Sequence, residues 1–116
     1  MFNGFVKRLP VAFYQLPSGR VPVREWLKSL DDADRKIIGR SIKDVEFRWP
    51  VGMPVCRPLG DGLWEVRSDI TQGRISRVLF CIHGGRMVLL HAFIKKTQKT
   101  PQTDLDIALK RKKEIT

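Results

Sequence analysis

The sequence predicts a single α+β domain in which helices lie against an antiparallel sheet, and three observations support this. Its 116 residues are enough for one hydrophobic core but too few for two ordinary domains. Apolar residues recur at helical spacing in residues 22–49, whereas from Leu63 onward they alternate as in strands. Helical spacing returns in the basic tail at residues 103–115. We therefore expect one domain over residues 1–116, ending in a short basic helix.

The first half of the chain is predicted to hold a short strand and a helical hairpin. Residues 11–16 (VAFYQL) are rich in β-branched, aromatic and aliphatic side chains and stop at a Pro-Ser-Gly turn signal. This strand needs a partner in the later sheet. Pro22 suits the first turn of a helix, and Asp31 or Asp32 can cap a second helix that ends before Pro50.

Residues 50–62 are predicted to form an ordered but irregular connection, because prolines and glycines punctuate them throughout. After this segment the apolar period becomes two. Strands are expected at residues 63–69, 74–83 and 86–94, with the last two joined by the hairpin signal Gly84-Gly85. The runs VLFCI and MVLL are apolar at successive positions, so the sheet should be covered on both faces.

Charge and composition narrow the range of partners. The chain has a formal net charge of +10 and a pI near 10.2, a surplus that attracts polyanions, although it can also serve solubility alone. No apolar run is long enough to span a membrane and no secretory signal is evident, so no membrane partner and a cytoplasmic location are expected. Cys56 and Cys81 should be reduced, and the histidines share no metal-ligand spacing, so neither a metal nor another cofactor is expected.

Each of the three later strands supplies a cation. Arg67 lies on the first strand, Arg77 lies at the middle of the second, and Lys95 and Lys96 end the third. Alternation places Arg77 on an apolar face, where a charge must be paired or used for binding. A salt bridge to Glu65 or Asp69 on the neighbouring strand is one interpretation, and contact with a phosphate is the other.

The end of the last strand offers further candidates. The sequence KKTQK, which includes Lys99, can form either a solvated turn or a phosphate site with hydroxyl and amide donors. His91 lies on the strand that leads into this cluster. It is either a core residue with its hydrogen bonds satisfied or a catalytic residue. Arg74, at the start of the second strand, is a further candidate for RNA binding.

The motifs PLGDGLWEVRSD, RVLF and MVLLHAFIKKTQKTP, followed by a helix with ALKRKKE, resemble the phage-derived, HigB-like branch of the RelE/ParE toxin superfamily. The similarity runs from about Val11 to Glu114. It implies a toxin of a type II toxin–antitoxin pair, with a RelE-like twisted antiparallel sheet, an N-terminal helical hairpin and a short basic C-terminal helix.

The resemblance implies an activity and roles for specific residues. RelE and HigB relatives are ribosome-dependent endoribonucleases that cut mRNA without metal, using the ribose 2′-hydroxyl as nucleophile. Arg67 matches a basic position on the first strand, and Arg77 matches the central-strand arginine that holds the scissile phosphate. Lys95 and Lys96 match the basic position after the last strand. A lysine among other cations gives up its proton more readily, so either lysine, or His91, is a candidate general base.

In one respect the sequence departs from the pattern of the family. RelE has a C-terminal tyrosine that stacks on a base, whereas the only tyrosine here is Tyr14. Phe93 or Trp64 can take that role, since any aromatic face can hold a base.

Two alternatives to the nuclease remain at this point. One is a ParE-like toxin that binds DNA gyrase, and the other is an inactive nucleic-acid-binding module. The family also implies partners: the ribosome with its mRNA, and an antitoxin, often of the helix-turn-helix type, through which the toxin reaches operator DNA.

Overall fold

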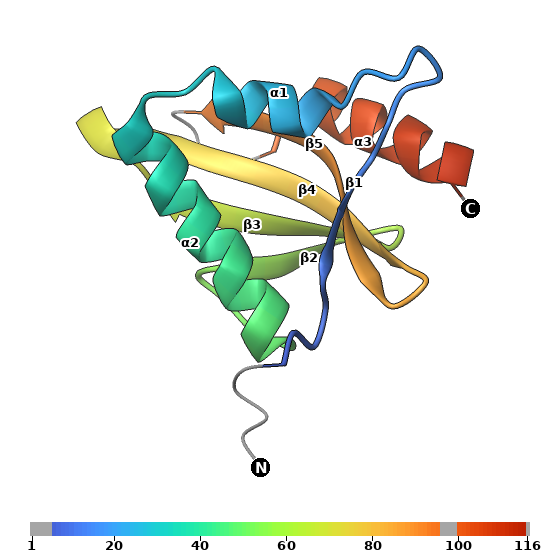
Figure 1. Cartoon of the computed structure of the whole chain (residues 1–116), viewed down its shortest axis with the longest axis horizontal. Helices are drawn as coiled ribbons and strands as arrows, with labels where there is room; N and C mark the ends of the chain where they lie inside the picture. The colour runs from blue at the N-terminus through green and yellow to red at the C-terminus, as the bar shows by residue number, and fades with distance from the viewer. Residues whose placement is uncertain (1–5, 96–99, 116) are drawn as a thin grey trace.

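The structure is a computed structural model that describes residues 6–95 and 100–115. Its centre is a five-stranded sheet with the strand order β1-β5-β4-β3-β2 (Figure 1). The α+β class and the order of strand, two helices, sheet and final helix are confirmed. The elements are β1 (Val11–Phe13), α1 (Pro22–Lys28), α2 (Asp32–Arg48), β2 (Cys56–Gly60), β3 (Leu63–Asp69), β4 (Ile75–His83), β5 (Arg86–Lys95) and α3 (Gln102–Ile115).

The predicted helical hairpin is confirmed as α1 and α2. Pro22 begins α1, where its missing N–H would have had no intrahelical partner. Asp31 holds the N-cap position of α2, but its side chain makes no capping hydrogen bond. Ile38, Ile42 and Val45 recur at helical spacing and are buried, so they form the face of α2 that packs on the sheet.

The sequence predicted an antiparallel sheet, but one pair of strands in the structure is parallel. Strand β1 does find its partner in the later sheet, but it runs parallel to β5, with Val11 opposite Met87 and Phe13 opposite Leu89. A parallel pair requires a long crossover between its strands, and here the two helices and three strands between β1 and β5 supply it. Strands β2 to β5 pair antiparallel, as predicted.

The prediction that residues 50–62 form only an irregular connection is wrong. They contain β2, which pairs antiparallel with β3. Pro58 is compatible with this strand because β2 is the outermost strand, where an N–H on the outer side is not needed by the ladder. The register shifts between Pro58 and Gly60, which is a bulge at the end of the strand.

The hairpin predicted at Gly84-Gly85 is confirmed. Both glycines have positive φ, +59° and +74°, as a tight two-residue turn between antiparallel strands requires. It joins β4 and β5, which form the centre of the sheet and are largely buried.

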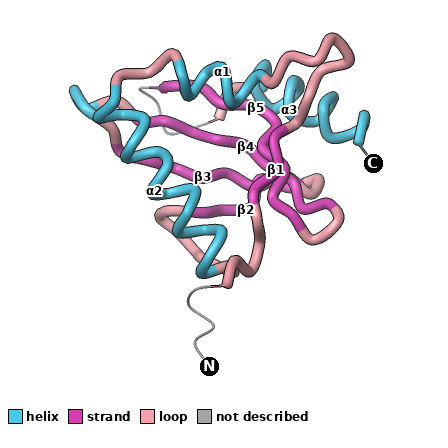
Figure 2. Tube along the Cα trace, viewed as in Figure 1, coloured by secondary structure: helices cyan, strands magenta, loops and turns pink. Residues whose placement is uncertain are grey.

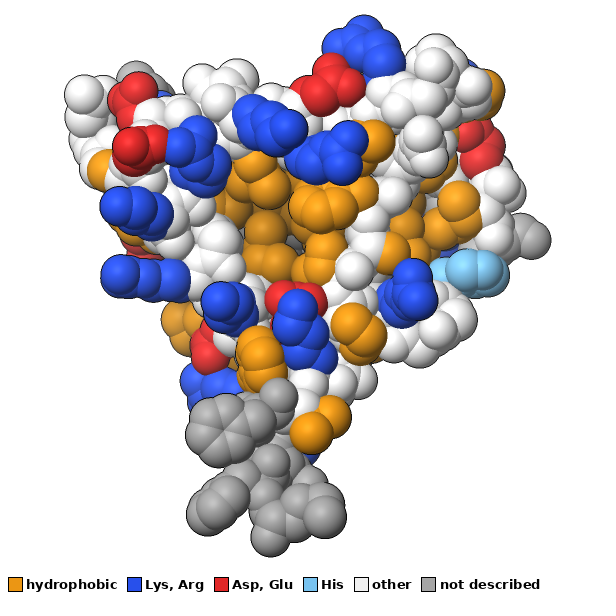
Figure 3. Space-filling model, viewed as in Figure 1, with side chains coloured by type: hydrophobic (Ala, Val, Ile, Leu, Met, Phe, Trp, Pro, Cys, Tyr) orange, Lys and Arg blue, Asp and Glu red, His pale blue; other side chains and the backbone are white. Residues whose placement is uncertain are grey.

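Helices cover both faces of the sheet, as the two apolar runs predicted (Figure 2). On one face, α1 and α2 pack over a core that includes Val66, Val78 and Phe80. On the other face, α3 packs over a second core that includes Leu79 and Cys81. Figure 3 shows the side of α1 and α2, where apolar side chains are visible between the helices and lysine and arginine side chains surround them.

In the part of the chain that the structure describes, every helix is too short or too polar to cross a membrane. Cys56 and Cys81 are both buried free thiols, in agreement with the expectation that they are reduced.

Candidate functional site

The register of the central strands brings three of the predicted site residues into one row. Arg67 of β3 lies directly opposite Arg77 of β4, and Arg77 lies opposite Phe93 of β5. Residues paired in this way point to the same face of a sheet, which here is the face of α3. Two like charges directly opposite each other are destabilising, so this row requires a counter-charge.

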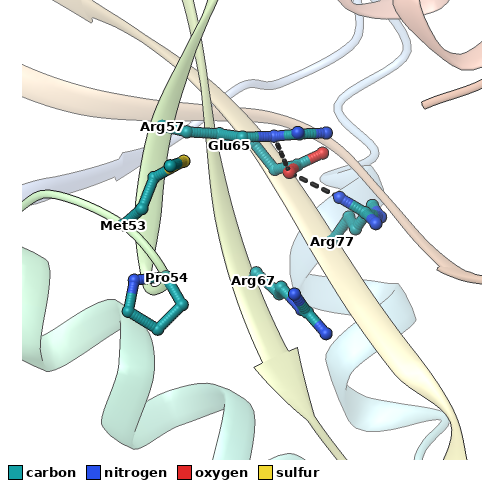
Figure 4. A pocket seen from close by; sticks show the side chains of 6 residues that line it. All are labelled: Met53, Pro54, Arg57, Glu65, Arg67 and Arg77. Atoms are coloured by element: carbon teal, nitrogen blue, oxygen red, sulfur yellow. Dashed lines mark hydrogen bonds and ion pairs between the residues drawn. The ribbon is translucent and has the colours of Figure 1, made fainter. Parts of the chain in front are cut away.

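Glu65 provides that counter-charge. Its side chain is completely buried, and its Oε2 atom accepts hydrogen bonds from Arg77 Nη1 at 2.6 Å and from Arg57 Nε at 2.8 Å (Figure 4). Its other oxygen, Oε1, accepts a hydrogen bond from Thr100 Oγ1 at 2.8 Å. Of the two salt bridges considered for Arg77, the structure has the one to Glu65, whereas Asp69 pairs with Arg67 at 3.3 Å.

The arginines around Glu65 line a pocket of about 310 Å³, which we call the cationic pocket. Its lining residues are Met53, Pro54, Arg57, Glu65, Arg67 and Arg77. Three arginines and one glutamate line the pocket, so its wall keeps a positive surplus even with Arg67 paired to Asp69. The side chain of Arg67 is 31% exposed, yet its Nε atom is buried and has no hydrogen-bond partner among the described residues. The pocket is therefore suited to an anion with several oxygens, such as a phosphate group.

Of the predicted lysines, the structure describes Lys95, while Lys96 and Lys99 lie outside the described residues. Lys95 ends β5 opposite Ile75, on the face of Arg77 and Phe93. It is half-buried. It lies two residues after Phe93, so it is a diagonal neighbour of Arg77 across the sheet.

His91 lies on the same face, two residues before Phe93. Its Nε2 atom is 2.6 Å from Asp104 Oδ1 of α3, and its ring stacks on that of Phe93 with the centroids 5.6 Å apart. The side chains of both members of the pair are mostly buried. The contact therefore ties α3 to β5 beside the arginine row.

Two other predicted residues lie away from the cationic pocket. Trp64 points to the opposite face, where it packs edge-on to Trp49 with the ring centroids 4.9 Å apart and stacks on Phe80. Arg74 pairs with the buried carboxylate of Asp34 in α2. Neither side chain is brought together with Arg67 and Arg77.

Asp34 is a second buried carboxylate, held at the start of α2. Its Oδ1 accepts hydrogen bonds from the backbone N–H of Thr71 at 3.0 Å and from Thr71 Oγ1 at 2.8 Å. These bonds, more than the neighbouring Arg74, lower the pKa of Asp34 from its ordinary value. This group ties α2 to the turn between β3 and β4.

Sequence reasoning missed part of the pocket. Arg57 was not singled out because the strand that carries it, β2, was expected to be irregular. Glu65 was considered only as a partner of Arg77, and Met53 and Pro54 were read only as loop residues. Alternation does place Glu65 on the face of Arg67, so the pairing was visible in the sequence as one of two choices.

Among the residues that the structure describes, no three His, Cys, Asp or Glu side chains gather in a way that could hold a metal ion. The groups available at the pocket are instead guanidinium donors, one carboxylate and the hydroxyl of Thr100.

Comparison with known proteins finds one matching family. No curated protein matches the chain. A family model described as "Phage derived protein Gp49-like (DUF891)" matches residues 25–113. The match runs from α1 to α3 and contains every residue of the cationic pocket. The chain therefore belongs to the phage-derived Gp49-like family, which is part of the RelE/ParE/HigB toxin superfamily.

Proposed function

We propose that this toxin is an endoribonuclease that cuts mRNA on the translating ribosome, and that the cationic pocket holds the scissile phosphate. The observation that carries the proposal is the pocket itself: Arg57 and Arg77 both pair with one buried carboxylate, Glu65, and Arg67 lines the same pocket. A protein that only docks on another protein does not require a surplus of guanidinium groups in a pocket of this size.

The proposed reaction is an in-line displacement at phosphorus. The ribose 2′-oxygen forms a bond to phosphorus, and the bond from phosphorus to the 5′-oxygen of the next nucleotide breaks. The proton of the 2′-hydroxyl goes to a general base, and a general acid protonates the leaving 5′-oxygen. The products are a 2′,3′-cyclic phosphate and a 5′-hydroxyl end. Negative charge builds on the phosphoryl oxygens, where fixed guanidinium groups stabilise the transition state.

In this proposal Glu65 positions the arginines. It contacts Arg57 and Arg77 through a single oxygen atom, so their guanidinium groups are held in place before RNA arrives. Groups fixed in advance need little reorganisation during the reaction, and this is the main source of electrostatic catalysis. Arg67, whose side chain is partly exposed at the wall, then contacts the substrate most directly.

The proton transfers are assigned to β5. His91 and Lys95 lie on either side of Phe93, so each is a diagonal neighbour of Arg77, at a Cα distance of about 7–8 Å for such pairs. Asp104 orients the His91 ring, as a carboxylate does in many acid–base pairs. We propose that His91 and Lys95, with Lys96, supply the general base and the general acid. Separate alanine substitutions at His91 and Lys95 will identify the roles by their effects on the pH dependence of cleavage.

The test of the proposal is to map RNA 5′ ends after induction of the toxin without its antitoxin. Wild-type toxin should produce new 5′-hydroxyl ends at codon-linked positions. Arg77→Ala should abolish them, and Arg67→Gln should reduce them at least about tenfold, since the loss of one transition-state contact costs this much or more. Arg20→Gln is a matched control, because Arg20 is an exposed arginine paired with Glu25 outside the pocket. Thermal unfolding of each variant will separate lost activity from lost folding.

Two outcomes would overturn the nuclease assignment. Intact mRNA together with accumulating gyrase–DNA breaks would indicate a ParE-like toxin. Normal growth on induction, together with RNA binding that falls as salt rises, would indicate an inactive binding module.

The toxin family implies a cognate antitoxin. We propose that this partner is a helix-turn-helix protein and that operator DNA is bound only through it. Co-purification from the natural two-gene segment, followed by operator binding with and without the antitoxin, tests this arrangement.

A further inference from the structure

We propose that a second pocket, adjacent to the cationic pocket, binds a nucleobase of the RNA next to the bound phosphate and prefers guanine. The inference rests on the proposed function for its substrate, a single-stranded RNA. It adds a determinant of sequence preference, located at the edge of the sheet beside α2.

The second pocket, which we call the edge pocket, has a volume of about 330 Å³. It is lined by Ser41, Pro54, Val55, Arg67, Ser68 and Asp69. It shares Pro54 and Arg67 with the cationic pocket, so these two residues form the boundary between the two spaces. A nucleotide with its phosphate on one side of this boundary can therefore place a base on the other.

The edge pocket lies beside the first residue of β2. Strand β2 begins at Cys56, opposite Val66, so the last residues of β3 extend beyond the paired part of the ladder. There the N–H of Arg67 donates to the carbonyl of Val55 at 2.8 Å, and this bond holds the segment before β2 against β3. Ser41 of α2 also lines the pocket.

The charges of the two pockets suit a phosphate in the cationic pocket and a base in the edge pocket. The cationic pocket is lined by three arginines and one glutamate, whereas the edge pocket is lined by one arginine and one aspartate, which pair with each other. A phosphate therefore favours the cationic pocket, and an uncharged base is better suited to the edge pocket. Pro54 and Val55 add apolar surface for the face of the base, and the charged pair faces its edge.

Asp69 is the residue that makes the site selective. Its side chain is 81% exposed, and it accepts from Arg67 Nη2 in a long contact of 3.3 Å, so its carboxylate remains accessible. An ionised carboxylate only accepts hydrogen bonds. Guanine presents two neighbouring donors, N1–H and the N2 amino group, on its Watson–Crick edge, and these match the two carboxylate oxygens. Adenine presents an amino donor beside an acceptor, which the carboxylate repels.

Arg67 suits the rest of the guanine edge. Arg67 lines both pockets and can donate to guanine O6, the acceptor next to N1. Ser68 is buried, and among the described residues its Oγ atom has no hydrogen-bond partner. Alternation along β3 turns the Ser68 side chain to the face opposite that of Arg67 and Asp69, so the contacts with the base are assigned to those two residues alone.

The first test measures binding of guanosine and adenosine 5′-monophosphates to the purified toxin by calorimetry. The two probes have the same phosphate and nearly the same size, so they differ at the base edge alone. Wild-type toxin should bind the guanosine nucleotide about tenfold more tightly, the lower end expected for one bidentate base contact. Asp69→Asn should remove or reverse this preference, because an amide matches adenine.

Asp61→Asn is the matched control. Asp61 lies in the turn between β2 and β3, is exposed, and has φ of +55°, a conformation that asparagine tolerates. This change should leave both affinities unaltered. Equal affinity of wild-type toxin for the two nucleotides, or a preference that persists in Asp69→Asn, would overturn the inference.

Cleavage mapping separates this inference from the proposed function. If RNA is cut, guanine should be enriched beside the cut, and Asp69→Asn should lose that enrichment while Asp61→Asn keeps it. Cutting without any base preference would overturn the edge pocket and leave the nuclease standing. Selective guanosine nucleotide binding that depends on Asp69, without any cutting, would support the edge pocket and overturn the nuclease.

Discussion

The two faces of the sheet are built from different interactions. Under α1 and α2, the face is apolar, and Phe80, Val66 and Val78 pack against the isoleucines and valines of the helices. Under α3, one end of the face is apolar, but the other end holds Glu65 with Arg57 and Arg77. The difference shows how a small domain can separate stability from binding. Apolar packing closes one face, whereas the other face holds a paired charge cluster at the wall of the cationic pocket.

The largest expected effect comes from breaking the apolar face. Phe80→Ala removes a fully buried ring that lies against Trp49 and Trp64. It should lower the free energy of unfolding by about 3–5 kcal/mol, through lost burial and the cavity that remains. Urea unfolding measures this. Ile82→Ala on the same strand is the control, because Ile82 is 42% exposed and should change stability by less than about 0.5 kcal/mol. Comparable losses in the two variants would contradict the assignment of this face as the main source of stability.

A somewhat smaller effect is expected from the charged face. Glu65→Leu leaves the guanidinium group of Arg77 buried without its carboxylate partner, and should cost about 3 kcal/mol of unfolding free energy. The double variant Glu65→Leu/Arg77→Met should recover most of this loss, because it removes both buried charges. The double variant should bind inorganic phosphate more weakly than wild type does, because it removes one arginine of the cationic pocket. If the double variant is no more stable than the single one, the ion pair is not the reason for the loss.

The two cysteines report on the two faces separately, because Cys56 belongs to the core under α2 and Cys81 to the core under α3. Burial raises the pKa of Cys56 to about 11, with a further contribution from Glu65, and burial also raises the pKa of Cys81. Neither thiol should react with iodoacetamide at pH 8 in the native state, since the thiolate is the nucleophile.

Loosening α3 should expose Cys81 alone. Asp104→Ala removes the contact with His91, so Cys81 should be alkylated about tenfold faster while Cys56 is unchanged, as read by mass spectrometry. Asp106→Ala, which removes an exposed aspartate on the same helix, is the control. Equal acceleration at both cysteines would mean that the faces open together.

The smallest effect concerns acid stability on the apolar face. The pKa of Asp34 is lowered by hydrogen bonds from Thr71, so the folded state favours the ionised carboxylate. Its stabilisation is therefore complete above the unfolded pKa and is lost as pH falls through the lower folded value. The difference in melting temperature between wild type and Asp34→Asn should be constant above about pH 5 and should shrink below about pH 4. A constant difference down to pH 2 would contradict this.

Sequence reasoning worked best where neighbours along the chain decide the outcome. The stripe of Ile38, Ile42 and Val45 and the Gly84-Gly85 turn were predicted correctly, because each depends on local spacing and backbone preference. The prediction for β2 was wrong, because a proline interrupts most strands. Pro58 is tolerated here because β2 is at the edge of the sheet. The sequence also did not predict that β1 is parallel to its neighbour, because strand direction depends on a partner about 75 residues away in the chain.

The sequence by itself determined the order of the helices and of every strand except β2, the face on which Arg67 and Arg77 lie, and the family, because periodicity and motif are properties of the chain alone. Only the tertiary structure decided which charges meet. It selected Glu65 over Asp69 as the partner of Arg77, added Arg57 from a strand that was not expected, and brought Thr100 to the same carboxylate. The physical reason is that a buried charge must be paired, and strand register together with long-range packing determines which partners are within reach.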